Sequence, residues 1–238
     1  MTATTLAPAR PDPGLEAVIL DYNGVVGLQP DRDQWMRLAA LAGWPADDLK
    51  AFMTAFWRYR EDYDAGAIST HVFWSRLLRN GVAAPPGSAL LAALRSQDIS
   101  MWTATDPAVL EVLRSARASS GVPMVLLSNA PAPLGDALDR EEWCATLMSK
   151  ALYSARLGCN KPNERTYTAA MAAAGWPDPS RTLFVDNLES NCTAAARLGL
   201  RTLHFRGDAA ELARHLPQPV QGARPPSMPA GARTAPSR

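Results

Sequence analysis

Short apolar runs alternate along this chain with longer segments whose apolar positions recur at helical spacing. Runs of about five apolar residues have the length of a buried strand, whereas apolar positions three or four residues apart indicate an amphipathic helix. The predicted strands are residues 17–20, 123–127, 151–153, 182–185 and 201–205, and the predicted helices between them are residues 107–119, 164–174 and 191–198. This alternation predicts an α/β fold with a three-layer, Rossmann-like parallel sheet.

The segment after the first strand has a different pattern. From residue 30 to residue 98 the apolar positions show helical spacing only, and Gly- and Pro-containing breaks divide them. An all-helical block inserted after the first strand of a parallel sheet is expected to cover the strand ends as a cap. The predicted core therefore consists of residues 14–29 and 99–216, with residues 30–98 as the inserted cap.

Both ends of the chain are poor in residues that could be buried. Residues 1–13 are rich in Thr, Ala and Pro, and residues 217–238 are rich in Pro, Gly, Ala, Ser and Arg. Such compositions cannot bury enough apolar surface to offset the entropy lost on ordering. Both segments are predicted to be disordered tails, and the first lacks the apolar stretch of a secretory signal.

The overall composition narrows the range of functions. The chain has 238 residues, of which 47% are hydrophobic, and 24 basic residues nearly balance 23 acidic ones. A net charge of +1 gives no electrostatic reason to expect a nucleic-acid or membrane partner. No apolar run approaches the ~20 residues of a membrane span, and the three cysteines form no CxxC pair. These features predict a cytoplasmic protein with reduced thiols.

Four predicted strands or loops are followed by polar residues of a kind suited to catalysis. They are Asp21 with Asn23, Ser128 with Asn129, Lys161 before a proline, and Asp186 with Asn187 and Asn191. Because the carboxyl ends of parallel strands share one edge of the sheet, these side chains are expected to meet there. Taken singly, each could equally be a turn, a helix cap or a solvated loop charge. Their occurrence together, in this order, predicts a functional site.

The residue types match the needs of phosphoryl transfer. A carboxylate such as Asp21 can attack phosphorus and form an aspartyl-phosphate. The hydroxyl of Ser128 can hold phosphate oxygens, and Lys161 can supply fixed positive charge. A second carboxylate, Asp186, can help to hold Mg²⁺, which prefers oxygen ligands.

On these motifs the chain resembles the haloacid dehalogenase-like (HAD) hydrolase superfamily over about residues 15–216. The helical insertion resembles the C1 cap of its subfamily I, and the segment from Tyr63 to Trp74 is similar to bacterial sugar-phosphate phosphatases and the phosphatase domain of soluble epoxide hydrolases. The resemblance implies that Asp21 is the nucleophile and a Mg²⁺ ligand, and that the backbone carbonyl of Asn23 and the side chain of Asp186 are further metal ligands. It implies that Ser128 and Asn129 bind phosphate and that Lys161 is a catalytic and phosphate-binding cation. Asn187 and Asn191 would be supporting residues. It implies a small phosphorylated metabolite as substrate.

Two positions depart from the usual phosphatase pattern. Asn23 stands where an aspartate normally serves as general acid and base, and Asn187 replaces the second acid of the fourth motif. An amide does not exchange a proton at neutral pH, and general acid–base help is typically worth ~10²–10⁴-fold in rate. A metal-bound water or a cap residue such as His71 could substitute. The aromatic residues Trp35, Trp57, Tyr59, Tyr63, Trp74 and Trp102 could line a substrate pocket or pack between helices.

The sequence therefore leaves three functions open. The first is a Mg²⁺-dependent phosphatase with reduced acid–base catalysis. The second is a HAD-fold protein that has lost or reduced hydrolysis and acts as a binding or regulatory protein, as the two amides suggest. The third is a dehalogenase-type displacement at carbon by Asp21 without a metal. A monomer and a homodimer are equally compatible with the pattern.

Overall fold

A computed structural model of the chain describes residues 14–79 and 82–217. The predicted N-terminal tail and the predicted C-terminal tail beyond residue 217 lie outside the described residues. Five parallel strands form one sheet in the order β3-β2-β1-β4-β5. The strands are β1 (Ala17–Leu20), β2 (Met124–Ser128), β3 (Lys150–Tyr153), β4 (Thr182–Asp186) and β5 (Arg201–His204).

Eleven α-helices accompany the sheet in the described part of the chain. Four lie between β1 and β2: α1 (Arg32–Leu41), α2 (Leu49–Asp64), α3 (Thr70–Leu77) and α4 (Ala89–Trp102). The others are α5 (Pro107–Ser120), α6 (Ala132–Leu138), α7 (Glu142–Leu147), α8 (Ser154–Leu157), α9 (Glu164–Ala173), α10 (Glu189–Arg197) and α11 (Ala209–His215). Two short 3₁₀ turns cover Ala46–Asp48 and Pro179–Arg181.

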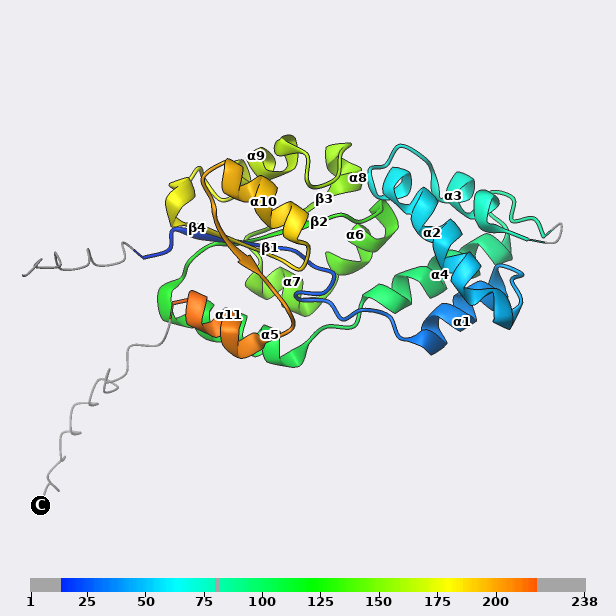
Figure 1. Cartoon of the computed structure of the whole chain (residues 1–238), viewed down its shortest axis with the longest axis horizontal. Helices are drawn as coiled ribbons and strands as arrows, with labels where there is room; N and C mark the ends of the chain where they lie inside the picture. Colours follow the sequence, from blue (N-terminus) through cyan, green and yellow to red (C-terminus); the bar gives the residue numbers. More distant parts are fainter. Residues whose placement is uncertain (1–13, 80–81, 218–238) are drawn as a thin grey trace, which may run out of the picture.

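The sheet separates two apolar cores because successive strand residues point to opposite faces. Val18 and Leu20 of β1 pack into the core that contains residues of α5, α7 and α11, whereas Ile19 packs against residues of α9 and α10. Figure 1 shows α9 and α10 on one side of the sheet and α5, α7 and α11 on the other. The three-layer α/β prediction is therefore confirmed, and continuous apolar runs arise because both faces are buried.

Helices α1 to α4 form a separate helical body beside the carboxyl edge of the sheet (Figure 1). Their aromatic side chains pack edge to face, as in the pair Trp35 and Phe56 with ring centroids 4.9 Å apart. Helix α4 runs without a break to Trp102, so the predicted boundary between residues 98 and 99 falls inside a helix. The buried side chains Met101 and Trp102 continue its apolar face and explain this length. The division into core and cap domains stays a prediction.

Several helix ends follow from local sequence. Asp106 caps α5 by accepting hydrogen bonds from two backbone N–H groups, Pro107 starts the helix, and Gly121 ends it in the left-handed region. Asp31 and Gln34 form a capping box at the start of α1.

Within residues 14–79 and 82–217, no helix combines the length and apolar character needed to cross a membrane.

Candidate active site

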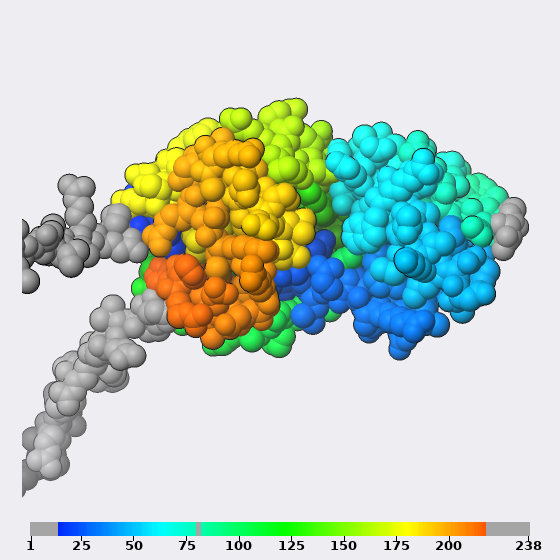
Figure 2. Space-filling view, viewed as in Figure 1, coloured from blue at the N-terminus to red at the C-terminus, as the bar shows by residue number. Residues whose placement is uncertain are grey.

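A cavity of about 470 Å³ lies where the cap meets the carboxyl ends of the strands. Its walls come from both bodies and consist of Asp21, Asn23, Gln29, Trp57, Asp64, Trp102, Asn129, Lys161, Asn187, Leu188 and Asn191. In Figure 2 the surface is hollowed between the cyan part of the cap and the yellow-orange segment that contains α10. The cavity therefore collects residues from six separate stretches of the chain.

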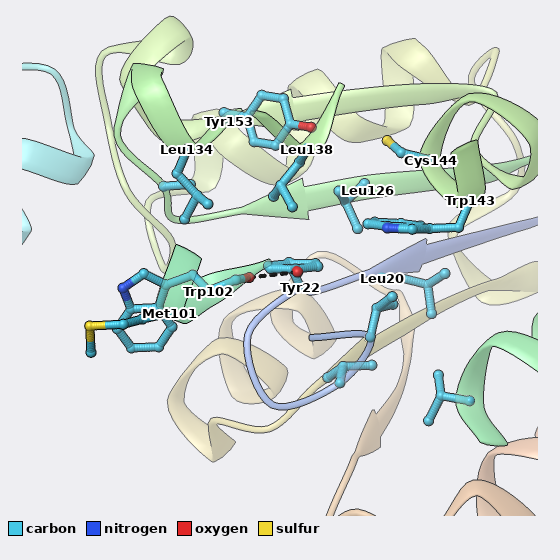
Figure 3. Close-up of a cluster of buried hydrophobic side chains, with 14 of the residues drawn as sticks. Leu20, Tyr22, Met101, Trp102, Leu126, Leu134, Leu138, Trp143, Cys144 and Tyr153 are labelled. Atoms are coloured by element: carbon cyan, nitrogen blue, oxygen red, sulfur yellow. Dashed lines mark hydrogen bonds between the residues drawn. The ribbon is translucent and has the colours of Figure 1, made fainter. Parts of the chain in front are cut away.

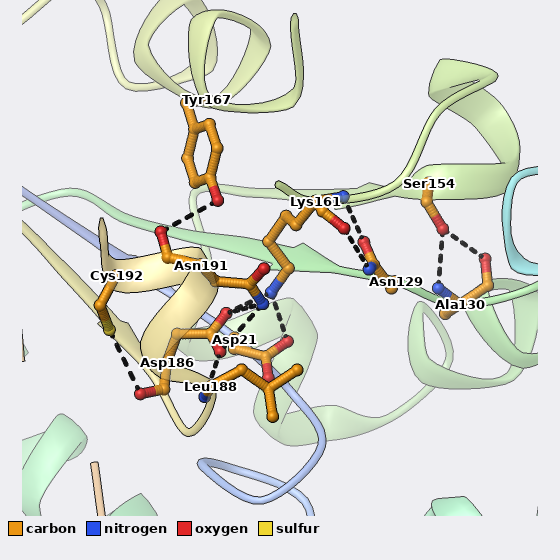
Figure 4. A network of polar contacts seen from close by, with 10 residues as sticks. All are labelled: Asp21, Asn129, Ala130, Ser154, Lys161, Tyr167, Asp186, Leu188, Asn191 and Cys192. Atoms are coloured by element: carbon orange, nitrogen blue, oxygen red, sulfur yellow. Dashed lines mark hydrogen bonds and ion pairs between the residues drawn. The ribbon is translucent and has the colours of Figure 1, made fainter. Parts of the chain in front are cut away.

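Lys161 joins two carboxylates at the base of this site. Its Nζ lies 2.7 Å from Asp21 Oδ1 and 2.7 Å from Asp186 Oδ2. Figure 4 shows the lysine side chain reaching between the two acids. All three side chains are buried, and Asp21 is the most exposed of them, at 9%. We call Lys161, Asp21 and Asp186 the core triad.

The turn after β1 fixes the direction of Asp21. Tyr22 is fully buried, donates a hydrogen bond from its hydroxyl to the carbonyl of Trp102 at 2.6 Å, and stacks on Trp143 (Figure 3). Gly24 adopts a φ of +82°, and a Cβ there would lie 2.4 Å from Asn187 Nδ2. Only glycine fits this conformation and this close approach. Tyr22 thus ties the turn after β1 to Trp102, the last residue of α4.

Asp186 is held by hydrogen bonds from its own β4–α10 connection. Its Oδ1 accepts from the backbone N–H of Leu188 at 2.8 Å, and Asn191 Nδ2 lies 3.1 and 3.0 Å from Oδ1 and Oδ2. With Lys161, these donors occupy both oxygens of a side chain that is 0% exposed. Asn191 therefore contacts Asp186 directly, and its supporting role in the site stays a prediction.

The residues after β2 have two different environments. Asn129 exchanges hydrogen bonds with the backbone of Lys161, accepting from its N–H at 2.8 Å and donating to its carbonyl at 3.0 Å. Its side-chain amide therefore positions the lysine, a role that sequence reasoning missed. The hydroxyl of Ser128 is buried and has no hydrogen-bond partner in the described structure. A buried unpaired hydroxyl is costly unless a ligand satisfies it, but Ser128 is not among the residues that line the cavity, so its role in phosphate binding stays a prediction.

Burial and charge shift the proton affinities of the core triad. Burial, with a contribution from Asp186, raises the pKa of Asp21 to about 7, although Lys161 opposes this shift. Burial alone lowers the pKa of Lys161, but the two carboxylates outweigh it and hold that pKa above its usual value. The lysine is therefore charged at neutral pH.

The donor set of the site fits a magnesium ion. Asp21, after β1, lines the cavity, and Asp186, at the end of the adjacent strand β4, is 0% exposed and shares Lys161 with it. Mg²⁺ is commonly held by one or two carboxylates together with waters and substrate phosphate. No group of three or more His, Cys, Asp or Glu side chains suited to a metal occurs in residues 14–79 and 82–217. The residues therefore match a shared protein–substrate site better than an all-protein metal cage.

The other residues named from the sequence are distributed as follows. Asn23 and Asn187 line the cavity, and the side-chain oxygen of Asn23 is buried without a partner in the described structure. His71 is not among the cavity-lining residues. Of the six aromatic residues considered, Trp57 and Trp102 line the cavity, Trp35, Tyr63 and Trp74 are buried, and Tyr59 lines a separate groove on the cap.

Three cavity-lining residues, Asp64, Gln29 and Leu188, were not singled out from the sequence. Asp64 closes α2 and faces the cavity, and Gln29 lies on the connection from β1 to the cap. The i,i+4 spacing of Arg60 and Asp64 indicates an ion pair on one helix face, but it carries no information on what that face meets. The pattern of hydrophobic and polar positions gives no indication that Gln29 lies at the cavity.

Comparison with known proteins identifies the fold. No protein-family model matches the chain, and no curated protein matches it. Among solved structures, a HAD family enzyme from Bacteroides thetaiotaomicron aligns with a TM-score of 0.65 at 19% identity, covering 82% of this chain and 96% of that one. A predicted HAD-like hydrolase from Porphyromonas gingivalis aligns with a TM-score of 0.63 at 18% identity, covering 84% and 97%.

Dehalogenases share the same fold. An L-2-haloacid dehalogenase aligns with a TM-score of 0.59 at 20% identity over 85% of this chain and 98% of that one. The Bacteroides enzyme has also been solved in complex with magnesium and inorganic phosphate. This chain therefore has the HAD-like hydrolase fold, an α/β core with an inserted helical cap, as its four motifs predict. The particular chemistry has to be inferred from the site itself.

Proposed function

We propose that this protein is a HAD-type hydrolase that cleaves a small phosphate ester through Asp21. The observation that carries this proposal is the core triad, in which Lys161 lies 2.7 Å from both carboxylates at the floor of the cap–core cavity. Lys161 holds one carboxylate oxygen of Asp21, and Asp21 lines the cavity. This arrangement suits a carboxylate that acts as a nucleophile.

The residues divide the work of phosphoryl transfer. Asp21 attacks phosphorus, the P–O bond to the leaving alcohol breaks, and the phosphoryl group is carried on the aspartate. Lys161 and the unpaired hydroxyl of Ser128 stabilise the charge on the phosphoryl oxygens. Water then attacks the phosphorus, which releases inorganic phosphate and regenerates Asp21.

The charge balance of the site supports a magnesium requirement. Lys161 neutralises only one of the two carboxylates, so the core triad has a net charge of about −1 when both acids are ionised. A phosphate dianion would be repelled by this charge. Mg²⁺ held by Asp21 and Asp186 would supply the missing positive charge and polarise the phosphoryl oxygens.

The cavity walls favour a leaving group with an apolar face. Trp57 and Leu188 are 49% and 53% exposed and line the cavity together with Trp102. An indole ring at a cavity wall can pack against the flat face of a sugar or an aromatic ring. We therefore propose a phosphorylated sugar or a similar small metabolite as the substrate class.

A dehalogenase activity is the second candidate, because dehalogenases match the fold about as well as the other HAD structures do. In that reaction Asp21 would displace halide from carbon without a metal. Asp186 counts against it in our view, since a second carboxylate beside the nucleophile has a clearer use in holding a cation. A binding protein without turnover is the remaining alternative, and Asn23 motivates it.

One screen separates these functions. Purified wild-type protein and Asp21→Asn are assayed on a panel of phosphorylated metabolites with Mg²⁺ or with EDTA, and on 2-haloacids for chloride release. The proposal predicts Mg²⁺-dependent phosphate release by the wild type only. Chloride release in EDTA would replace it with dehalogenase chemistry. Absence of any turnover that depends on Asp21 would leave the binding function.

A further inference from the structure

The cap contributes its own carboxylate to the cavity. Asp64 is the last residue of α2 and lines the same cavity as Asp21. Its Oδ1 accepts a hydrogen bond from Arg60 Nε at 2.7 Å, and its side chain is 12% exposed. No hydrogen bond engages its second carboxylate oxygen within residues 14–79 and 82–217. This side chain is anchored on one side and open toward the cavity on the other.

Asp98 also binds Arg60, and its contacts differ from those of Asp64 because both of its carboxylate oxygens are engaged within the protein. Arg60 Nη1 donates to Asp98 at 2.9 and 3.2 Å, so both oxygens of Asp98 are engaged. Asp98 Oδ1 also accepts from the indole N–H of Trp102 at 3.1 Å. The Asp98 side chain is 4% exposed and does not line the cavity. Of the two acids that neutralise Arg60, only Asp64 has a free oxygen that faces the site.

Asp64 is also docked onto the core. Its backbone carbonyl accepts a hydrogen bond of 2.5 Å from the hydroxyl of Ser154, which in turn accepts one from the backbone N–H of Ala130. Ala130 follows the Ser128-Asn129 pair, so a short chain of hydrogen bonds links the phosphate-binding residues to Asp64. The Ser154–Ala130 part of this chain is visible in Figure 4. The position of Asp64 relative to the core is therefore fixed by polar contacts.

The turn after β1 supplies no side chain that could act as general acid and base, and the carboxylate of Asp64 can take this role. Asn23 has no ionisable proton, and His71 does not line the cavity. On the basis of the phosphatase function proposed above, we propose that Asp64 is the general acid and base of the reaction, in place of a carboxylate at position 23. Asp64 and Asn23 come from different bodies, cap and core, and face the same space.

The proton transfers balance over one cycle. While Asp21 forms its bond to phosphorus and the P–O bond of the ester breaks, neutral Asp64 gives its proton to the leaving oxygen, which departs as an alcohol. In the second step, ionised Asp64 takes a proton from the water that attacks phosphorus. The P–O bond to Asp21 then breaks, phosphate leaves, and Asp64 is again neutral.

The surroundings of Asp64 suit both steps. Burial raises its pKa to about 7, with smaller contributions from Asp98 and Glu61, against the opposing effect of Arg60. A catalytic pKa near the working pH keeps both the acid and the base form available. Besides Asp64, the charged residues that line the cavity are Lys161 and Asp21. A bound phosphoryl group would lie between these two residues and Asp64.

The test compares leaving groups in Asp64→Asn, an isosteric change that keeps an oxygen for Arg60. For alkyl phosphates, which have poor leaving groups, kcat/KM should fall by about 10²–10⁴-fold. For p-nitrophenyl phosphate, whose leaving group needs no proton, kcat/KM should change by less than about tenfold. The value of kcat should still fall for this substrate, with a burst of nitrophenol, because the base for the second step is missing.

Two matched variants make the result specific. Asp98→Asn alters the other acid on Arg60 and should lower stability while keeping the wild-type dependence on leaving group. Asn23→Asp placed in the Asp64→Asn background should restore a large part of the alkyl-phosphate activity. Equal losses for both leaving groups in Asp64→Asn, or the same pattern in Asp98→Asn, would overturn the proposal.

A measurement on the wild type alone provides a second check that does not depend on how the variants fold. With an acid in place, log(kcat/KM) should vary only weakly with the pKa of the leaving alcohol, whereas a steep negative slope would mean that no acid acts. Failure of the phosphatase function itself would look different. In that case wild type and Asp21→Asn would be equally inactive on every ester, including p-nitrophenyl phosphate.

Discussion

The molecule contains two buried triads of similar composition, one in the core and one in the cap. In the core triad Lys161 lies between Asp21 and Asp186, and in the cap triad Arg60 lies between Asp64 and Asp98. Each has one enclosed acid, with side chains 0% and 4% exposed for Asp186 and Asp98. Each also has one acid that lines the shared cavity, Asp21 or Asp64.

The difference between the triads lies in the cation and in the supporting elements. In the core triad, Asp21 and Asp186 lie at the carboxyl ends of β1 and β4, and Lys161 lies on the loop between α8 and α9. A lysine can exchange its partners for a bound phosphate because its ammonium is a compact charge on a flexible stem. The cap triad joins helices α2 and α4 through an arginine, whose planar group also lies over the rings of Phe56 and Trp102. Its geometry is therefore rigid, which suits a group that must stay in place while it transfers a proton.

The largest expected effect separates the two cavity-facing acids. Asp21→Asn removes the nucleophile and should reduce phosphate release to the background of the buffer, since no other carboxylate can form the covalent intermediate. Asp64→Asn should keep measurable turnover of p-nitrophenyl phosphate. Steady-state assays of both variants on one aryl phosphate provide the comparison. Residual activity of Asp21→Asn equal to that of Asp64→Asn would contradict the division of roles.

Removal of either cation tests whether the triads also support the fold. Lys161→Met and Arg60→Met each leave two buried carboxylates without a counter-charge, and each should lower the free energy of unfolding by about 3–5 kcal/mol. Urea denaturation at pH 8 measures both losses. A loss below about 1 kcal/mol for one variant would show that its acids are neutralised in another way.

The contact between cap and core can be weakened at one glycine. Gly66 has a φ of +71°, and a Cβ there would lie 2.7 Å from the carbonyl oxygen of Ala155. Gly87 has a φ of +78° with nothing within 4 Å, so it is a matched control. Both alanine variants incur a backbone cost of about 1 kcal/mol, and Gly66→Ala should lose about 1–3 kcal/mol more through the clash. It should also lower kcat/KM for alkyl phosphates, because the proposed general acid Asp64 is displaced. Equal effects at both glycines would contradict this contact.

The smallest expected effect is a pH dependence of stability. Burial raises the pKa of Asp64 to about 7 in the folded chain from 3.8 for a free aspartate side chain, so the folded state binds more protons at this side chain between those values. Its contribution to stability is therefore greatest at low pH and is lost as the pH rises through about 7. Asp64→Asn lacks this term, so its free energy of unfolding relative to wild type should increase by at least about 1 kcal/mol from pH 5 to pH 8. A constant difference in urea denaturation would contradict the raised pKa.

The sequence predicted the parts of the fold that depend on continuous local patterns. The strands appear within one residue of their expected limits, because both sheet faces are apolar and the runs are short and unbroken. The predicted α10 begins two residues early in the structure, at Glu189. Helices α6, α7, α8 and α11 were not predicted, because they have only four to seven residues and too few turns to show a period.

The candidate site was predictable to the extent that strand ends share an edge of the sheet. That rule placed Asp21, Lys161 and Asp186 together, as the structure shows. It could not place Asp64, which reaches the cavity only because the cap docks through Ser154. Nor could it show that the side chain of Asn129 binds the backbone of Lys161. Partners that are 32 residues apart produce no regular spacing in the sequence from which their hydrogen bond could be predicted.

The most direct test of the account is to look for phosphate on Asp21. Wild-type protein mixed with p-nitrophenyl phosphate and Mg²⁺ is quenched in acid during turnover, digested, and analysed by mass spectrometry. The account predicts a phosphoryl group on the peptide that contains Asp21, and a larger amount of it in Asp64→Asn, where the second step is slowed. Turnover of the ester with no phosphoryl group on Asp21 in either protein would contradict it.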